Sequence, residues 1–215
     1  MQKKERFKNV FEWFEKHVSI VSTELHYKNP YQLLVAVILS AQCTDKRVNT
    51  ITPAFFERFP TVEDLAKAEV NDIYQLISSC SYPNNKSKNL SGMAKMLVTF
   101  FNSVVPSDVE LMQNLPGVGR KTANVVASVI YNKPTLAVDT HVFRVSARIG
   151  LSENAKTPLE TELQLIKNIP KKQLPNAHHW LILHGRYTCV ARKPKCNICG
   201  LTEWCKYYQN FKNEI

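Results

Sequence analysis

The chain has 215 residues, of which 44% are hydrophobic and 21% are charged, as in an ordinary globular protein. Lys and Arg exceed Asp and Glu by 28 to 18, and the net charge of +10 favours a polyanionic partner, either a nucleic acid or an anionic membrane surface. The longest apolar run, residues 33–39, is too short to span a membrane, so an integral membrane protein is excluded. Residues 1–16 mix Lys with Glu and resemble neither a signal peptide nor a transit peptide, so we expect a cytoplasmic protein.

The hydrophobic pattern is helical along almost the whole chain. Apolar residues recur at three- and four-residue spacing in the first segment, at Phe7, Val10, Phe11 and Phe14. Asn29 and Pro30 then predict a helix start, with Asn as the N-cap and Pro at the first helical position. Residues 31–41 are apolar almost all round, which predicts a buried helix, although a buried strand would fit the same composition.

The remaining segments also favour helices. Thr44 predicts the cap of the next helix, which Pro53 is expected to split or kink. Further helical patterns follow at residues 62–67, 71–79, 86–101, 107–114, 120–131, 140–150, 157–167 and 171–185. We find no convincing strand alternation, so the predicted fold class is all-α. The pair Lys133-Pro134 is the expected internal boundary, because proline disfavours helix at the residue before it.

The stretch Leu115-Pro116-Gly117-Val118-Gly119-Arg120-Lys121 has two glycines just before a helical pattern. Glycine permits positive φ and leaves backbone N–H groups uncovered, and the helix N-terminus adds further N–H groups and partial positive charge. An anion site for a DNA phosphate is therefore predicted, formed by Leu115, Gly117, Val118, Gly119 and Arg120. The alternative is a tight joint between two helices with a surface lysine.

Lys121 suggests chemistry as well as binding. Its amine can attack a sugar C1′ and form a Schiff base. A free lysine has a pKa of about 10.4, and burial or a helix N-terminus would lower that pKa towards neutrality. Asp139, which precedes an apolar periodic segment, is predicted to cap a helix. A capping carboxylate that also faces a cleft could stabilise positive charge on the sugar or relay a proton.

Four cysteines lie close together near the C-terminus with the spacing C-x6-C-x2-C-x5-C: Cys189, Cys196, Cys199 and Cys205. This spacing predicts a metal centre and leaves zinc and an iron–sulfur cluster both open. The loop between the first two cysteines carries three cations that we expect to contact phosphates, namely Arg192, Lys193 and Lys195. An ordinary solvated basic loop is the alternative. Cys43 and Cys80 are expected to be small buried hydrophobes.

Several stretches occur together in one order: residues 39–42, 115–126, 137–145, 178–188 and the four cysteines. Together they resemble the motifs of the endonuclease III family of DNA glycosylases, within the helix-hairpin-helix superfamily. The resemblance covers roughly residues 29–205. It implies two helical domains that grip DNA between them. Residues 22–132 would hold the hairpin, and residues 1–21 with 133–215 would hold a [4Fe-4S] cluster.

The resemblance also implies an activity, which is that of a base excision repair glycosylase and abasic-site lyase. Lys121 would be the nucleophile and Asp139 would assist it. The enzyme would flip an oxidised pyrimidine out of the duplex, because its glycosidic bond is inaccessible in the stack. Lys121 would displace the base, and β-elimination would nick the strand 3′ to the lesion. The expected partner is double-stranded DNA with damaged pyrimidines or abasic sites, bound by a monomer away from any membrane.

Three further DNA contacts follow from the resemblance. Gln42 matches a residue that fills the gap left by the flipped nucleotide. His141 is similar to a residue that packs beside the site, although a helix-surface histidine is the simpler interpretation. Where the family has a Gly-Leu-Tyr-like turn with an apolar wedge, this chain departs from it and reads Ser81-Tyr82-Pro83. We expect Tyr82 to act as the wedge.

Two other functions compete with this prediction. The adenine glycosylase branch resembles the chain in its hairpin and cluster but lacks the nucleophilic lysine, and the chain is too short for that branch's extra C-terminal domain. A non-catalytic DNA-binding module would need the hairpin and the basic loop, but not Lys121 and Asp139 together. The presence of both residues favours a glycosylase with lyase activity.

Overall fold

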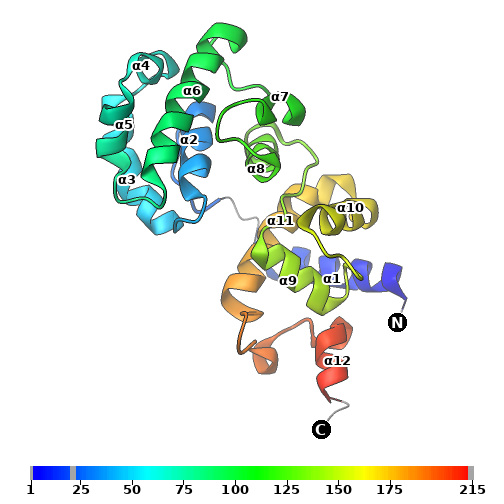
Figure 1. Cartoon of the computed structure of the whole chain (residues 1–215). Helices are drawn as coiled ribbons and strands as arrows, with labels where there is room; N and C mark the ends of the chain where they lie inside the picture. The colour runs from blue at the N-terminus through cyan, green and yellow to red at the C-terminus, as the bar shows by residue number, and fades with distance from the viewer. Residues whose placement is uncertain (1, 20–22, 213–215) are drawn as a thin grey trace. The chain divides into compact units, whose positions relative to one another are not determined.

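A computed structural model describes residues 2–19 and 23–212, and within them the chain forms helices and no strands (Figure 1). The prediction of an all-α fold is therefore confirmed. The helices and helical turns are α1 (Lys3–His17), α2 (Pro30–Ser40), α3 (Asp45–Arg58), α4 (Val62–Lys67), α5 (Val70–Ile77), α6 (Pro83–Phe101), α7 (Val109–Gln113), α8 (Arg120–Tyr131), α9 (Thr140–Ile149), α10 (Pro158–Asn168), η1 (Lys171–Gln173), α11 (Leu174–Leu183), η2 (His184–Thr188), η3 (Cys196–Ile198), η4 (Thr202–Trp204) and α12 (Lys206–Lys212). Among the described residues, no helix is both long and apolar enough to span a membrane.

The chain divides into two compact units, each with its own core. The hairpin unit is Thr23–Asn132. The cysteine unit joins Met1–Ser22 to Lys133–Ile215, so it resumes at the Lys133-Pro134 pair.

Helix α2 is the central helix of the hairpin unit. It packs against α3, α6 and α8, and in Figure 1 it lies among the other helices of the unit. Every residue from Leu33 to Leu39 is buried, as expected for a helix that is apolar on all sides. The Asn29 side chain accepts a hydrogen bond of 2.9 Å from the Gln32 N–H. The predicted buried helix and its cap are confirmed.

In helix α3 the predicted cap is confirmed, and the split that was one of the two outcomes expected at Pro53 does not occur. Thr44 caps it by accepting a 3.2 Å hydrogen bond from the Arg47 N–H. The helix then continues through Pro53 to Arg58 without being split there. Proline removes one N–H donor from the helix interior, but Val48 and Phe55 on either side are completely buried. Their packing holds the helix together across the proline.

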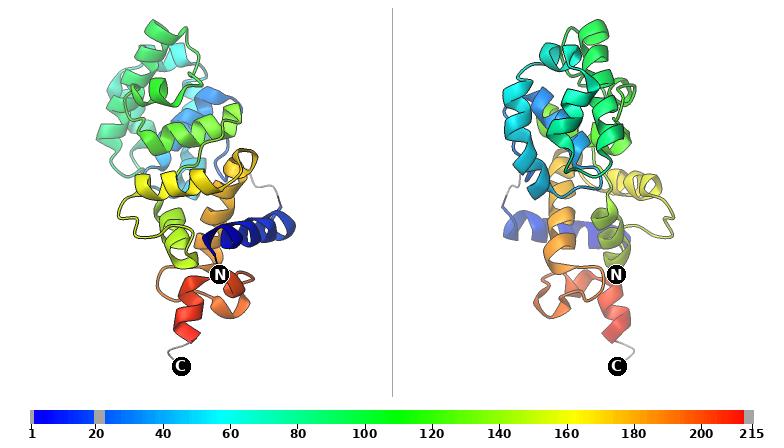
Figure 2. Two further views of the ribbon diagram at one scale, coloured as in Figure 1. Left: turned by 90° about the vertical axis from the view of Figure 1, so that its right-hand side faces the viewer. Right: turned by 60° about the vertical axis from the view of Figure 1, so that its left-hand side comes forward.

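The cysteine unit is built from segments that are far apart in sequence. Phe14 of α1 stacks on Trp180 of α11, with ring centroids 5.9 Å apart and an interplanar angle of 8°. The Arg6 side chain, also on α1, is 3% exposed, and its Nε donates a 2.9 Å hydrogen bond to the Trp204 carbonyl. The N-terminal helix is thereby fixed to the C-terminal part of the chain, and Figure 2 shows α1 beside these segments.

The helix predicted over residues 171–185 is replaced by three elements, η1, α11 and η2. In η2 the backbone widens to a π-helical turn, and the Cys189 N–H donates a 2.7 Å hydrogen bond to the His184 carbonyl. Gly185 lies within this turn, and a Cβ added there would come within 2.8 Å of the His141 Cβ. The π-helical turn thus packs closely on α9, directly before the first cysteine of the cluster motif.

Candidate functional site

The predicted hairpin lies between α7 and α8. Leu115 and Val118 are 2% and 5% exposed, and the Val118 N–H donates a 3.0 Å hydrogen bond to the Leu115 carbonyl. Their side chains therefore pack in the core, and only their main chain is available to a ligand. Gly117 has a φ of 80°, and a Cβ added there would lie 2.9 Å from the Asn89 Cβ. The turn thus requires glycine at position 117 on both conformational and steric grounds.

Lys121 lies in the first turn of α8, whose N-cap is Gly119. Lys121 and Arg120 are both exposed, as is Gly119. A helix of 12 residues presents partial positive charge and N–H groups at this end, so the surroundings of Lys121 suit a phosphate. The Lys121 side chain is therefore not buried by its own unit.

Asp139 is the N-cap of α9, as its place before an apolar periodic segment predicts. Its Oδ1 accepts a 2.8 Å hydrogen bond from the Val142 N–H, and the carboxyl side chain is half-buried. One carboxylate oxygen thus accepts a hydrogen bond from the helix backbone, and the carboxylate can still accept further hydrogen bonds from a ligand. Lys121 belongs to the hairpin unit and Asp139 to the cysteine unit.

His141 is half-buried in the first turn of α9. Its Nδ1 lies 3.2 Å from the Arg144 Nη2, and this same guanidinium nitrogen donates a 2.9 Å hydrogen bond to the Gly185 carbonyl. Arg144 thereby fixes the imidazole against η2, so His141 is more than a free surface histidine.

Gln42 and Tyr82 lie in two neighbouring turns of the hairpin unit. Both residues are exposed, and both adopt left-handed backbone conformations, with φ values of 54° and 55°. The Ser81 hydroxyl donates a hydrogen bond to the Gln42 carbonyl, which fastens one turn to the other. Positive φ is uncommon outside glycine, and such strain is concentrated at functional sites.

Behind these turns, the Cys43 and Cys80 sulfur atoms are 3.8 Å apart. Cys80 is buried as expected, whereas Cys43 is only half-buried. Burial raises the pKa of the Cys80 thiol to about 11, so this thiol stays protonated near neutral pH.

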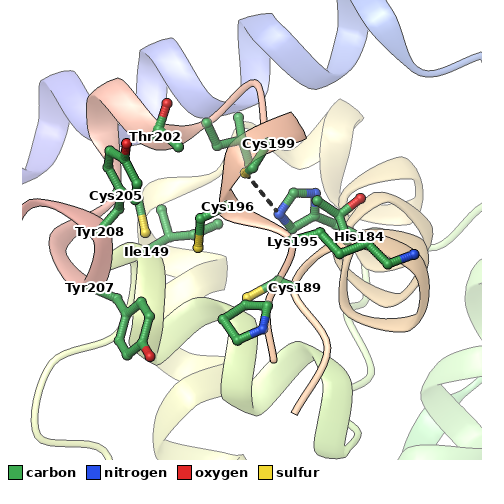
Figure 3. A pocket seen from close by; sticks show the side chains of 13 residues that line it. Ile149, His184, Cys189, Lys195, Cys196, Cys199, Thr202, Cys205, Tyr207 and Tyr208 are labelled. Atoms are coloured by element: carbon green, nitrogen blue, oxygen red, sulfur yellow. Dashed lines mark hydrogen bonds between the residues drawn. The ribbon is translucent and has the colours of Figure 1, made fainter. Parts of the chain in front are cut away.

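The four C-terminal cysteines line a single pocket, together with Ile149, His184 and Leu201 (Figure 3). Cys189 follows η2, Cys196 begins η3, Cys199 follows it, and Cys205 follows η4. Figure 3 shows their sulfur atoms gathered around the pocket. Burial raises the pKa of the Cys199 thiol to about 11, so the thiolates that metal binding needs would have to be stabilised by the metal itself.

The four thiols that line this pocket fit either of the two metal centres that the spacing left open, because zinc and an iron–sulfur cluster both accept four cysteines.

Arg148 of α9 supports this pocket from one side, although no sequence pattern singles it out. Its guanidinium donates hydrogen bonds of 2.8 Å to the Val190 carbonyl and 2.6 Å to the Ala191 carbonyl. One of its nitrogens also lies 3.5 Å from the Cys189 sulfur. A cation at this distance would stabilise the negative charge of a metal-bound thiolate.

The basic loop between Cys189 and Cys196 is held at its base. The Lys195 N–H donates a 2.9 Å hydrogen bond to the Thr188 carbonyl, while Arg148 holds the other side of the loop. Arg192, Lys193 and Lys195 are all exposed. The three predicted cations therefore face solvent on a fixed loop.

A second residue that the sequence motifs do not include is Lys86, in the first turn of α6. Its side chain is 5% exposed. A lysine in the first turn of a helix lies at the positive end of the helix dipole, which is unfavourable. This position is the sequence feature that could have singled out Lys86.

Comparisons with known proteins agree with one another. Residues 35–171 match the family described as "HhH-GPD superfamily base excision DNA repair protein". Residues 189–205, which begin and end at the outer cysteines, match the "iron-sulfur binding domain of endonuclease III".

Individual relatives extend the similarity over the whole chain. The chain is 48% identical to endonuclease III of Rickettsia felis, over 94% of both chains. It is 43% identical to endonuclease III of Bacillus subtilis, covering 85% of this chain and 84% of that one. A solved structure of a trapped endonuclease III–DNA covalent intermediate, an estranged-adenine complex, is 40% identical, with a TM-score of 0.92 over 99% of this chain and 100% of that one.

Proposed function

Because the chain belongs to the endonuclease III family of base excision repair enzymes, we propose that Lys121 is the nucleophile with which it attacks the sugar of a damaged nucleotide. The protein is a DNA glycosylase with abasic-site lyase activity, and it carries a [4Fe-4S] cluster. The roles of individual residues and the choice of damaged base are our proposals.

The proposed reaction starts at the Lys121 amine. Its neutral nitrogen attacks C1′, the bond from C1′ to the base breaks, and the bonding electrons leave with the base. A proton passes from the nitrogen to the ring oxygen as the bond from C1′ to that oxygen breaks, and the sugar opens to a protonated Schiff base. In the β-elimination a base removes a proton from C2′, and the bonding electrons form a double bond to C3′. The bond from C3′ to the phosphate oxygen breaks at the same time, which nicks the strand 3′ to the lesion.

The position of Lys121 at the start of α8 supports this role, since a phosphate held at the helix N-terminus would bring its sugar to the amine. We assign Asp139 the task of stabilising the positive charge that develops on the sugar. Its half-buried carboxylate retains acceptor capacity beyond the capping bond to Val142.

We propose that the substrates are oxidised pyrimidines and abasic sites in duplex DNA, and that the protein acts as a monomer. The solved relative is described as an estranged-adenine complex. Adenine pairs with thymine, so an unpaired adenine fits removal of the pyrimidine base opposite it. Gln42 and Tyr82 would fill the gap in the duplex. Both are exposed on neighbouring turns, and the Tyr82 ring is large enough to stack between bases.

We also propose that Cys189, Cys196, Cys199 and Cys205 each bind one iron of the cluster. All four line the same pocket, and thiolates are the usual ligands of such clusters. The basic loop that they enclose would contact the DNA backbone through Arg192, Lys193 and Lys195.

Borohydride reduction tests the proposed nucleophile, because it converts a Schiff base into a stable covalent adduct. The intact protein should form an adduct with a duplex that contains an abasic site, and Lys121→Gln should form none. Lys95→Gln, which removes an exposed lysine of α6, is the matched control and should be trapped like the unaltered protein.

Two results would contradict the proposal. Trapping of Lys121→Gln at the unaltered yield would assign the nucleophile to another amine. An intact protein that binds the duplex but gives no adduct would overturn the nucleophilic mechanism itself.

A further inference from the structure

Lys86 is a buried cation that the reaction does not use. Its side chain is 5% exposed, and burial lowers its pKa below the ordinary value. Burying a charged group is costly unless hydrogen bonds compensate for the lost water. The hydrogen-bond partners of Lys86 therefore show which groups the buried ammonium stabilises.

The partners of the Lys86 amine are main-chain oxygens at the end of α2. Its Nζ donates hydrogen bonds of 2.8 Å to the carbonyls of Leu39 and Ala41. The last carbonyls of a helix have no partner within the helix and carry partial negative charge. An ammonium group has three donors on one atom, so a single lysine can satisfy two of these carbonyls and neutralise their charge.

Lys86 also contacts the turn that contains Tyr82, through its own backbone. Its N–H donates a 3.1 Å hydrogen bond to the carbonyl of Tyr82, the left-handed residue that caps α6. On the other side, Ala41 directly precedes the left-handed Gln42. One residue thus holds the carbonyl of Tyr82 and the carbonyl just before Gln42, and the Ser81 hydroxyl adds a bond to the Gln42 carbonyl.

We infer that Lys86 is a positioning residue, which sets the Gln42 turn and the Tyr82 turn in fixed register so that both side chains enter the duplex together. This inference rests on the proposed roles of Gln42 and Tyr82. A strained backbone conformation persists only where its surroundings fix it, and Lys86 supplies hydrogen bonds to both strained turns. Its contribution would matter for DNA that has to be opened, and not for the chemistry at Lys121.

Comparing duplex and single-stranded substrates in full-length protein with its cluster tests the inference. A single-stranded abasic oligonucleotide needs Lys121 but no gap filling, whereas an abasic duplex needs both. In Lys86→Met, single-turnover cleavage of the duplex should fall by roughly 10- to 100-fold, as expected for misplaced contacts. Borohydride trapping of the single strand should stay at the rate of the unaltered protein. 2-Aminopurine placed opposite the lesion fluoresces more strongly when the protein unstacks it, and this increase should be absent in the variant.

Matched variants control for charge and folding. Lys88→Met removes an exposed cation from the same helix and should leave duplex cleavage near normal at low salt. Lys86→Arg keeps donors at the same place and should recover part of the duplex rate. If Lys86→Met does not fold, Ser81→Ala removes the hydroxyl bond to Gln42 and should give a smaller loss that is likewise confined to the duplex.

Two outcomes would overturn the inference: unchanged duplex cleavage in Lys86→Met, or an equal loss on duplex and single strand in the folded variant. Neither outcome would contradict the proposed role of Lys121 as the nucleophile. Failure of the intact protein to be trapped on either substrate would instead refute the proposed function itself.

Discussion

At the scale of single residues, Asp139 combines a structural role with a proposed chemical one. It caps α9 through the hydrogen bond from the Val142 N–H, and it is our candidate for stabilising charge on the sugar. Asparagine can accept the same capping hydrogen bond but carries no charge, whereas alanine can do neither. Two substitutions at one position can therefore separate the two roles.

We expect Asp139→Asn to keep the thermal stability of the unaltered protein while base excision falls sharply. Asp139→Ala should lose activity as well and should also lower the free energy of unfolding by about 1 kcal/mol, the typical value of an N-cap. Thermal denaturation and single-turnover excision measure the two effects. Normal excision by Asp139→Asn would show that the carboxylate charge has no part in the reaction.

At the scale of elements, α9 links the proposed catalytic residue to the cluster pocket. Asp139 caps its first turn, and Arg148 near its other end holds the loop that follows Cys189. The π-helical turn η2 packs on the same helix at Gly185. Helix α9 is therefore joined to the cluster pocket both through Arg148 and through η2.

Arg148→Met tests this link, because it keeps much of the side-chain volume but removes the hydrogen bonds to the loop and the interaction with the Cys189 sulfur. The variant should lose its cluster faster than the unaltered protein when a chelator is added, as followed by visible absorbance and iron content. Arg192→Met, at an exposed position of the loop itself, is the control and should keep its cluster. Equal rates of loss would show that Arg148 does not stabilise the cluster.

At the scale of the whole molecule, the net charge of +10 predicts DNA binding that weakens steeply with salt. The outward-facing cations of the basic loop should account for a definite part of this dependence. Replacing Arg192, Lys193 and Lys195 by Gln should reduce the slope of log affinity against log salt by about 2 to 3, close to one unit for each phosphate that the loop no longer neutralises.

A second triple variant separates the loop from overall charge. Lys156, Lys167 and Lys171 are exposed elsewhere in the same unit, and their replacement by Gln removes the same three charges. It should change the slope much less, as measured by fluorescence anisotropy across a salt series. Equal slopes for the two triples would mean that the loop makes no direct phosphate contacts.

The sequence by itself determined the features that depend on near neighbours in the chain. The caps at Asn29, Thr44 and Asp139 each join a side chain to the N–H three residues later, so residue type and position are enough to predict them. The hairpin glycines and the four cysteines are similarly local. Residues 33–39, apolar on every side, could only form a buried element, and the helix prevailed there.

Only the tertiary structure decided the features that join distant residues. Arg6 binds the carbonyl of Trp204, 198 positions away, and Lys86 binds that of Leu39, 47 positions away. The continuity of α3 through Pro53 likewise goes with the complete burial of Val48 and Phe55 on either side of it. No local pattern carries this information, because a buried cation and a strained turn are tolerated only where the folded chain supplies partners for them.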